Sequence, residues 1–211
     1  MRVVLAMLIS IVIPAWAAAQ TRLPANDIHG TIGRSGADHE HVDSRQWYGS
    51  ALAALSVGHY WSDHAKTEVE AVWNSLGSRE LFENIEREGY TTYAISNYKA
   101  GDVRIGVAQL YQFGRNQWVH PYVGAGVDLV RRHVSIERPE QARTVFLRDG
   151  NIPVQVPASS MHKTTFFAHA VLKTGLKMYV SEKTFFVTEL KFGIRRDVDH
   201  AVWKLGMGRD F

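Results

Sequence analysis

Hydrophobic and polar residues alternate along most of this chain, and the clearest example lies between residues 102 and 113. The odd positions there include Val103, Ile105 and Val107, whereas Asp102 and Arg104 occupy even positions. A period of two is typical of β-strands whose two faces meet different surroundings. The pattern predicts strands at 66–76, 102–113, 119–129, 166–180, 186–195 and 200–208, and two further strands fit at 27–34 and 46–60.

The connections between these strands alternate in length. Short turns are predicted at 61–64, 115–117 and 181–183, and longer connections at 35–45, 78–100 and 133–164, with a brief fourth at 197–199. Eight strands joined in this way predict an all-β fold, an eight-stranded antiparallel up-and-down β-barrel whose first and last strands pair. Within the second long connection, Leu81, Phe82 and Ile85 predict a short helix over 78–88 that packs on the rim of the barrel.

The first 19 residues have a different pattern. Arg2 precedes an almost wholly apolar run from Val3 to Ile13, and small residues follow Pro14. A charged start, a short apolar core and an A-x-A site are the features of a secretory signal peptide. We expect cleavage after Ala19 and export of residues 20–211 as a single barrel domain; the alternative is an uncleaved membrane anchor.

Composition narrows the classes of protein further. The 211 residues include no cysteine, which excludes disulfide scaffolds, thiolate zinc sites, iron–sulfur clusters and cysteine nucleophiles. The formal net charge is +3 at pH 7, too small an excess to predict a nucleic-acid partner. The sequence has no P-loop and no zinc-protease motif, so we expect no cofactor.

Alternation alone does not show which face of the barrel points inward. A secreted soluble barrel would enclose an apolar ligand with its apolar face, whereas an outer-membrane barrel turns that face to lipid. Aromatic residues beside the predicted short turns favour lipid, because such rings gather at the membrane interface. They are Tyr60, Trp61, Tyr111, Phe113, Trp118, Tyr179, Phe185, Phe186 and Phe211. We therefore predict a transmembrane β-barrel located in the outer membrane.

The opposite, polar face carries charges of both signs. The interior of an eight-stranded barrel is only wide enough for side chains, so these charges can pair across it. The residues expected in this lumen charge network are Glu68, Glu70, Arg104, Asp128, Lys173, Lys177, Glu189, Lys191 and Lys204. Such pairing would exclude large solutes, whereas leakage of small solutes stays open.

Basic residues gather where the predicted strands meet the long connections. In an outer membrane that rim meets the phosphates of lipopolysaccharide, and guanidinium groups match phosphate geometry. The residues expected to make this structural lipid contact are Arg34, Arg45, Arg131, Arg132, Arg195 and Arg196.

Three stretches of the sequence resemble a known family. The ending with Trp203, Leu205, Met207 and Phe211 at apolar positions resembles the C-terminal signature of outer-membrane barrel proteins, which the barrel-assembly machinery reads during insertion; Arg209 departs from it. The stretch 120–127, HPYVGAGV, resembles the "PYxGxGxG" opening of a central strand in the small OmpA-like and OmpW-like eight-stranded barrels of Gram-negative bacteria, with Asp128 in place of the third glycine. The segments 186–195, with Glu189, and 206–211 are also similar. The resemblance implies the fold and the outer-membrane location, and a role ranging from structural anchor to adhesin or small-solute pore.

Two candidate chemistries remain. The loop 38–43, DHEHVD, has the residue types of a metal site, but a surface loop does not hold them in place, so we predict no metal site there. A lipid A deacylase of this architecture uses a histidine, a serine and an acid on the outer face of the barrel. None of the strand histidines has a serine two residues away, so we expect no enzymatic activity; these histidines are His59, His120, His169 and His200. A lipid A-modifying enzyme and the soluble carrier stand as the alternatives.

Overall fold

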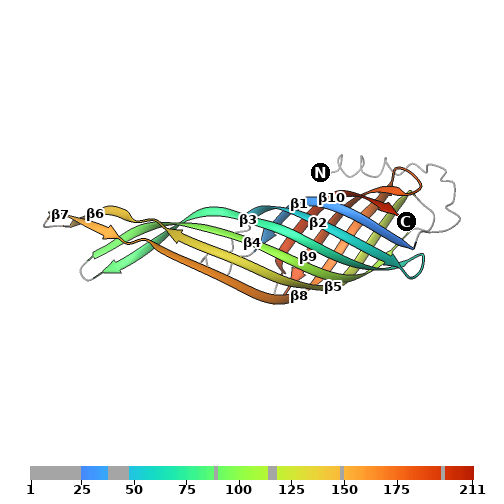
Figure 1. Ribbon diagram of the computed structural model, residues 1–211, viewed down its shortest axis with the longest axis horizontal. Helices are drawn as coiled ribbons and strands as arrows, with labels where there is room; N and C mark the ends of the chain where they lie inside the picture. The colour runs from blue at the N-terminus through green and yellow to red at the C-terminus, as the bar shows by residue number, and fades with distance from the viewer. Residues whose placement is uncertain (1–24, 38–47, 88–89, 114–117, 148–149, 196–197) are drawn as a thin grey trace, which may run out of the picture.

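A closed β-barrel forms the body of the molecule. The computed structural model describes residues 25–37, 48–87, 90–113, 118–147, 150–195 and 198–211. Eight antiparallel strands close the barrel in the order β1-β10-β9-β8-β5-β4-β3-β2 (Figure 1). Their bounds are β1 (Asn26–Ala37), β2 (Tyr48–Tyr60), β3 (Ala65–Arg87), β4 (Tyr90–Gln112), β5 (Val119–Arg138), β8 (Ser159–Tyr179), β9 (Thr184–Ile194) and β10 (Val198–Asp210). The predicted fold class is confirmed.

The barrel closes because its first and last strands pair along their whole length. β1 pairs with β10 from Asp27 opposite Asp210 to Ala37 opposite His200. The first strand is therefore longer than the predicted 27–34, since β10 offers a ladder partner to every residue as far as Ala37. Within the described ranges, no helix is long and apolar enough to cross a membrane. The predicted signal peptide and the 38–43 loop lie outside the described residues.

Four neighbouring strands are much longer than the other four. β3, β4, β5 and β8 have 20 to 23 residues, whereas β1, β2, β9 and β10 have 11 to 13. β2 pairs with β3 only as far as Ser75, and β3 continues to Arg87, about 40 Å further at ~3.3 Å per residue. The long strands form a projecting sheet beyond one end of the barrel, and β6 (Gln141–Leu147) and β7 (Gly150–Val156) make a separate hairpin at its far end (Figure 1). The start of β1 at Asn26 and the chain end at Phe211 lie together at the opposite end of the barrel.

The projecting sheet corrects two predictions. Most of the expected long connections 78–100 and 133–164 are continued strands, and the expected helix over 78–88 is part of β3. A β-bulge between Ser75 and Ser78 contains Gly77, whose φ of 84° suits glycine, and pairing resumes at Ser78 opposite Lys99. A short apolar run fits a helix or a strand, and the neighbouring β4 supplies the hydrogen-bond partners that decide for the strand.

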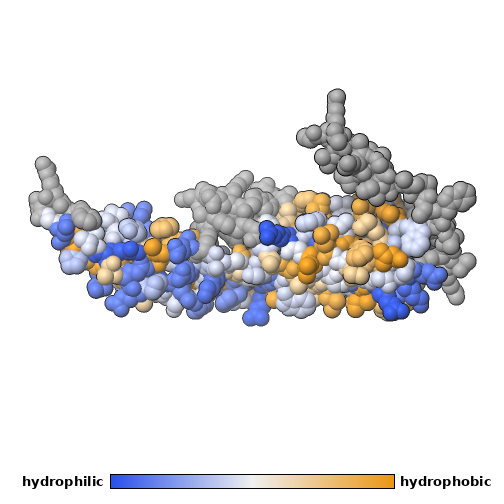
Figure 2. Space-filling view, turned by 90° about the horizontal axis from the view of Figure 1, so that it is seen from above, coloured by the Kyte–Doolittle hydropathy of each residue, from blue (hydrophilic) through white to orange (hydrophobic). Residues whose placement is uncertain are grey.

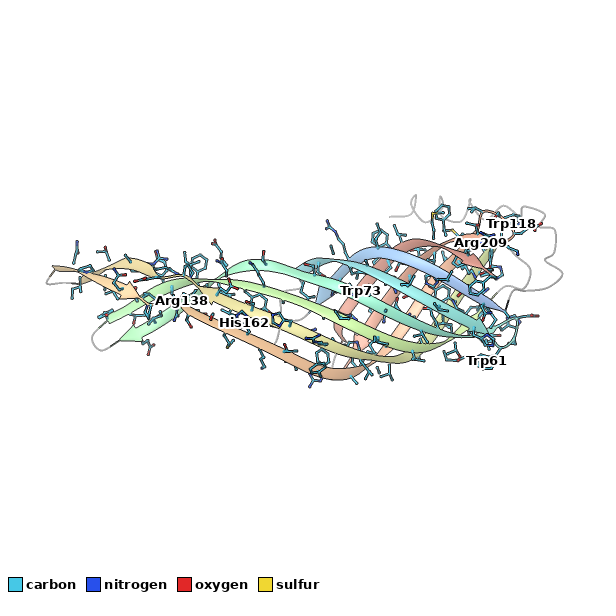
Figure 3. All side chains as sticks on the ribbon, in the orientation of Figure 1. Trp61, Trp73, Trp118, Arg138, His162 and Arg209 are labelled. Atoms are coloured by element: carbon cyan, nitrogen blue, oxygen red, sulfur yellow. The ribbon has the colours of Figure 1, made fainter. Side chains whose placement is uncertain are left out.

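The apolar face of the barrel points outward. Side chains such as Ile105, Val127 and Leu205 are about half exposed or more, and Figure 2 shows hydrophobic residues over the barrel and mostly hydrophilic ones over the projecting sheet. The soluble carrier with an apolar lumen is therefore wrong. Six of the nine expected interface aromatics are exposed near the short turns (Trp61 and Trp118 are labelled in Figure 3): Trp61, Tyr111, Phe113, Trp118, Phe186 and Phe211.

The other three expected interface aromatics turn away from lipid. Phe185 is 1% exposed and packs with Leu110 and Val187 inside the barrel. The Tyr60 hydroxyl donates to Asp27, and the Tyr179 hydroxyl donates to Asp210. These rings lie on the inward side of their strands, and the two hydroxyl groups need polar partners there.

Candidate functional site

Among the described residues, charged side chains from seven of the eight barrel strands line the lumen. Alternation along each strand places one residue in two on the inner face, so charged residues at these positions point into the lumen. The buried acidic residues are Asp27, Glu68, Glu70, Asp102, Asp128, Glu189 and Asp210, and the buried basic residues are Lys66, Arg104, Lys173, Lys177, Lys191 and Lys204. The near balance of charge matters, because a buried ion without a partner costs several kcal/mol.

The middle layer of the lumen is a network centred on Glu70 of β3. Its carboxylate accepts from Lys173 of β8 at 3.2 Å, from Lys191 of β9 at 2.7 Å, and from Lys204 of β10. Lys204 also contacts Glu189 at 2.7 Å. The pairs therefore connect β3 with strands on the far side of the barrel and cross the lumen.

The carboxylates of Glu68, Glu189 and Asp128 extend this network. Lys173 contacts Glu68 at 2.9 Å, and Tyr122 donates to Glu189 at 2.9 Å. Lys191 lies 2.6 Å from Asp128 of β5. Asp128 is the residue that replaces the third glycine of the family's strand opening, and here its carboxylate receives a lysine.

The layer near the short turns is built from residues that the sequence analysis mostly left out. Lys177 contacts Asp27 at 3.0 Å and Asp210 at 2.6 Å, and Lys66 contacts Asp27 at 2.9 Å. Lys177 alone among these was predicted as part of the network. Lys66, Asp27 and Asp210 follow the same alternation, so the signal was present in the sequence, but nothing in it showed that the strand ends also face the lumen.

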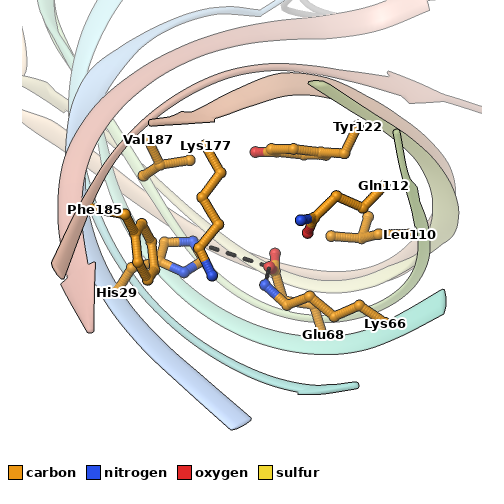
Figure 4. A pocket seen from close by; sticks show the side chains of 9 residues that line it. All are labelled: His29, Lys66, Glu68, Leu110, Gln112, Tyr122, Lys177, Phe185 and Val187. Atoms are coloured by element: carbon orange, nitrogen blue, oxygen red, sulfur yellow. Dashed lines mark hydrogen bonds and ion pairs between the residues drawn. The ribbon is translucent and has the colours of Figure 1, made fainter. Parts of the chain in front are cut away.

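A small cavity lies between these two layers. Figure 4 shows its lining, in which His29, Lys66 and Lys177 face Gln112 and Tyr122. The cavity has room for about one water molecule.

Arg104 lies apart from the glutamate network. Its guanidinium makes two hydrogen bonds with Asp102 of the same strand, at 2.8 and 2.9 Å, and Arg132 lies 3.9 Å from the same carboxylate. Arg104 was expected to pair across the lumen, but it makes this local pair instead, because positions 102 and 104 share one face of β4.

The inner face also makes room for these groups through glycine. Gly106 of β4 is opposite Asp128 of β5, and a Cβ at position 106 would collide with the Asp128 carboxylate. Gly58 stands in the same relation to Lys66 and Asp27. Charged side chains can cross the lumen at these two places because the neighbouring strand has a glycine there, without a side chain.

The arginines expected at the rim have two different environments. Arg34, Arg131 and Arg195 are exposed, whereas Arg132 is half-buried. Arg132 and Arg195 both lie over the ring of Phe167, at 5.1 and 5.3 Å. Arg45 and Arg196 lie outside the described residues.

The residues of the expected insertion signature share the lipid-facing side of β10. Trp203, Leu205 and Met207 are about half exposed and alternate with the buried Val202 and Lys204. Phe211 follows the strand, is 60% exposed, and its backbone pairs with Asn26. The geometry presents an apolar row to lipid.

The strand histidines separate into two groups. His120, His169 and His200 are buried on the inner face, as predicted, whereas His59 is exposed and contacts Asn26 Oδ1 at 2.9 Å. His169 and His200 come close together, which their spacing in the sequence could not show.

The fold and the paired lumen define a class of protein, the small barrels of the outer membrane. Residues 3–211 match the family model described as "Outer membrane protein beta-barrel domain", so the chain belongs to that family. No curated protein sequence matches the chain.

Solved structures show the same fold at low sequence identity. Neisserial surface protein A is 13% identical with a TM-score of 0.55, and the alignment covers 90% of this chain and 99% of that one. Ail, the attachment invasion locus protein of Yersinia pestis, is 9% identical with a TM-score of 0.54, covering 90% and 100%. OprG from Pseudomonas aeruginosa is 14% identical with a TM-score of 0.53, covering 90% and 97%.

Proposed function

We propose that this outer-membrane barrel is an attachment protein that conducts no solutes, exported through a cleaved signal peptide at residues 1–19. The observation that carries the proposal is the division of the molecule into an ion-paired barrel and a projecting sheet. The barrel holds the protein in the membrane, and the sheet reaches beyond the lipid to a partner.

The lumen supports the first half of the proposal. Glu70 binds three lysines from three strands, and these four residues are at most 4% exposed. A solute that crossed the barrel would have to separate such pairs, and breaking one buried ion pair costs about 3–5 kcal/mol. The lumen charge network is therefore a structural plug.

The projecting sheet supports the second half. Among the described residues, 76–87 of β3 and 159–169 of β8 have a strand partner on one side only. Exposed strand edges carry unpaired N–H and C=O groups that another chain can complete. Ail, which has the same fold, is named an attachment invasion locus protein, and this name agrees with a role in attachment.

The rim arginines and the C-terminal row complete the proposal. Arg34, Arg131 and Arg195 are exposed, and lipopolysaccharide phosphates are the anions that this rim would meet. The row ending in Phe211 is the part that the barrel-assembly machinery would read. We infer no catalytic role, and a lipid A deacylation assay on the purified barrel tests that inference.

Solute passage is tested with proteoliposomes that contain the purified barrel. Swelling in arabinose and single-channel conductance in planar bilayers should match protein-free membranes, with a large porin as the positive control. Swelling in arabinose above the protein-free rate would show a small-solute pore and overturn the plug.

Attachment is tested by shortening one hairpin in register. Ser78 pairs with Lys99, so deletion of 79–98 removes both arms of the β3–β4 extension and leaves the barrel ladder intact. Bacteria that display the shortened protein should adhere less to cultured animal cells than bacteria with equal amounts of the full chain. The amount of each protein is measured as the heat-modifiable band on SDS gels. Equal adherence would refute the role of this sheet.

A further inference from the structure

Three potential metal ligands from three different strands meet at the upper end of the lumen, toward the projecting sheet. Asp128 lies on β5, His169 on β8 and His200 on β10. One ligand atom from each lies within 4.8 Å of the others, and all three residues are buried.

The strand register explains how these residues come together. Asp128 is directly opposite His169 in the β5–β8 ladder. His200 is opposite Gly193 of β9, which lies between β10 and β8 and has no side chain on the inner face. The His200 ring therefore reaches across β9, and its centroid lies 4.6 Å from that of His169.

The donor set is that of a transition-metal site. We propose that Asp128, His169 and His200 bind a divalent first-row transition metal ion such as Zn²⁺, with water in the remaining position. Two imidazoles and one carboxylate with an open position are a recurrent ligand set for zinc and non-haem iron.

The distances require only small movements to close this site. Zinc ligands lie about 2.0–2.1 Å from the ion, so donor atoms in a tetrahedral shell lie roughly 3.3 Å apart. His169 Nε2 is already 3.6 Å from Asp128 Oδ2. The three donor atoms lie within 4.8 Å of one another, so each remaining separation has to shorten by at most about 1.5 Å.

The charges around the site set its affinity. Lys191 contacts Asp128 at 2.6 Å and competes with a cation for that carboxylate, but it also has Glu70 at 2.7 Å, so it can release Asp128 without losing its partner. Arg104 is held by Asp102. A metal ion and the Lys191 ammonium therefore compete for the Asp128 carboxylate, and the ammonium weakens metal binding by charge repulsion.

The test uses the full barrel, refolded in detergent and freed of metal by chelation. Calorimetric titration with ZnCl₂ should show one saturable site, and His169→Gln and His200→Gln should each weaken it by more than the ~10–100-fold typical of losing an outer-shell partner. Lys191→Met should strengthen it, because the competing ammonium is gone. A heat-modifiable band on SDS gels confirms that each variant has folded.

Other histidines supply the control. His133 and His162 stack at 6.1 Å on the projecting sheet, and His39 and His41 belong to the predicted connection 35–45. A barrel with glutamine at all four positions should bind zinc like the wild type. Loss of binding in that barrel, or unchanged binding in both lumen variants, overturns the proposal.

X-ray absorption at the zinc edge needs no variant. The wild-type barrel with one equivalent of zinc should show two imidazole ligands with the remaining ligands oxygen. A first shell without two imidazoles, or no saturable binding at all, refutes the site.

Discussion

Replacing Val107 with arginine tests the orientation of the whole barrel. Val107 lies on the outward face of β4, and its neighbours in the ladder are Val69 and Val127. All three are about half exposed. An arginine at this position meets apolar side chains on both adjacent strands.

The structure gives the depth of this position in the membrane. Tyr111, at the aromatic interface, is four residues from Val107, which is ~13 Å along the strand and, at a tilt of ~40°, about 10 Å of depth. The apolar band of such a barrel is about 25 Å tall, so Val107 lies near the midplane. Arginine at the midplane costs about 2–4 kcal/mol.

The measurement is urea unfolding of the barrel in phospholipid vesicles. Val107→Arg should lower the free energy of unfolding by about 2–4 kcal/mol. Asn97→Arg is the matched control, because Asn97 is exposed on the same face of β4 ten residues further into the projecting sheet, and it should change stability by less than about 0.5 kcal/mol. If both variants are equally stable, the apolar face does not lie against lipid and the reasoning is wrong.

Three further predictions concern the lumen and the chain end. Glu70→Ala should destabilise the barrel by about 3–5 kcal/mol in the same urea assay, because it leaves three buried lysines short of a carboxylate; a loss below 1 kcal/mol would contradict the plug. Gly106→Ala should cost about 1–3 kcal/mol, since its Cβ meets the Asp128 carboxylate, whereas Gly30→Ala, with open space around the new atom, should cost less; equal losses would refute the close approach. Phe211→Ala should reduce the amount of heat-modifiable barrel in the outer-membrane fraction at unchanged synthesis, and normal assembly would remove the last residue from the insertion signature.

The alternation of side chains made the barrel predictable. Strands such as 102–113 and 119–129 appear in the structure with their predicted faces, because one side of each meets lipid and the other meets charges. The short turns at 61–64 and 181–183 were equally clear, since each separates two alternating runs; the third, at 115–117, lies outside the described residues. The long connections were not, because the 78–88 segment has apolar residues that fit either a helical stripe or a strand.

The sequence by itself determined that this chain forms a transmembrane barrel and which face of its central strands points to the lumen, since both follow from a period of two and from the types of residue at each position. It did not determine the lumen residues at the strand ends, such as Asp27, Lys66 and Asp210. Only the tertiary structure decided which charged side chains form ion pairs with one another. Arg104 contacts Asp102 rather than a glutamate, and Glu70 gathers lysines from three distant strands. The meeting of Asp128, His169 and His200 was likewise invisible in the sequence. The physical reason is that contacts across a lumen depend on strand order and register, which arise only when the sheet closes.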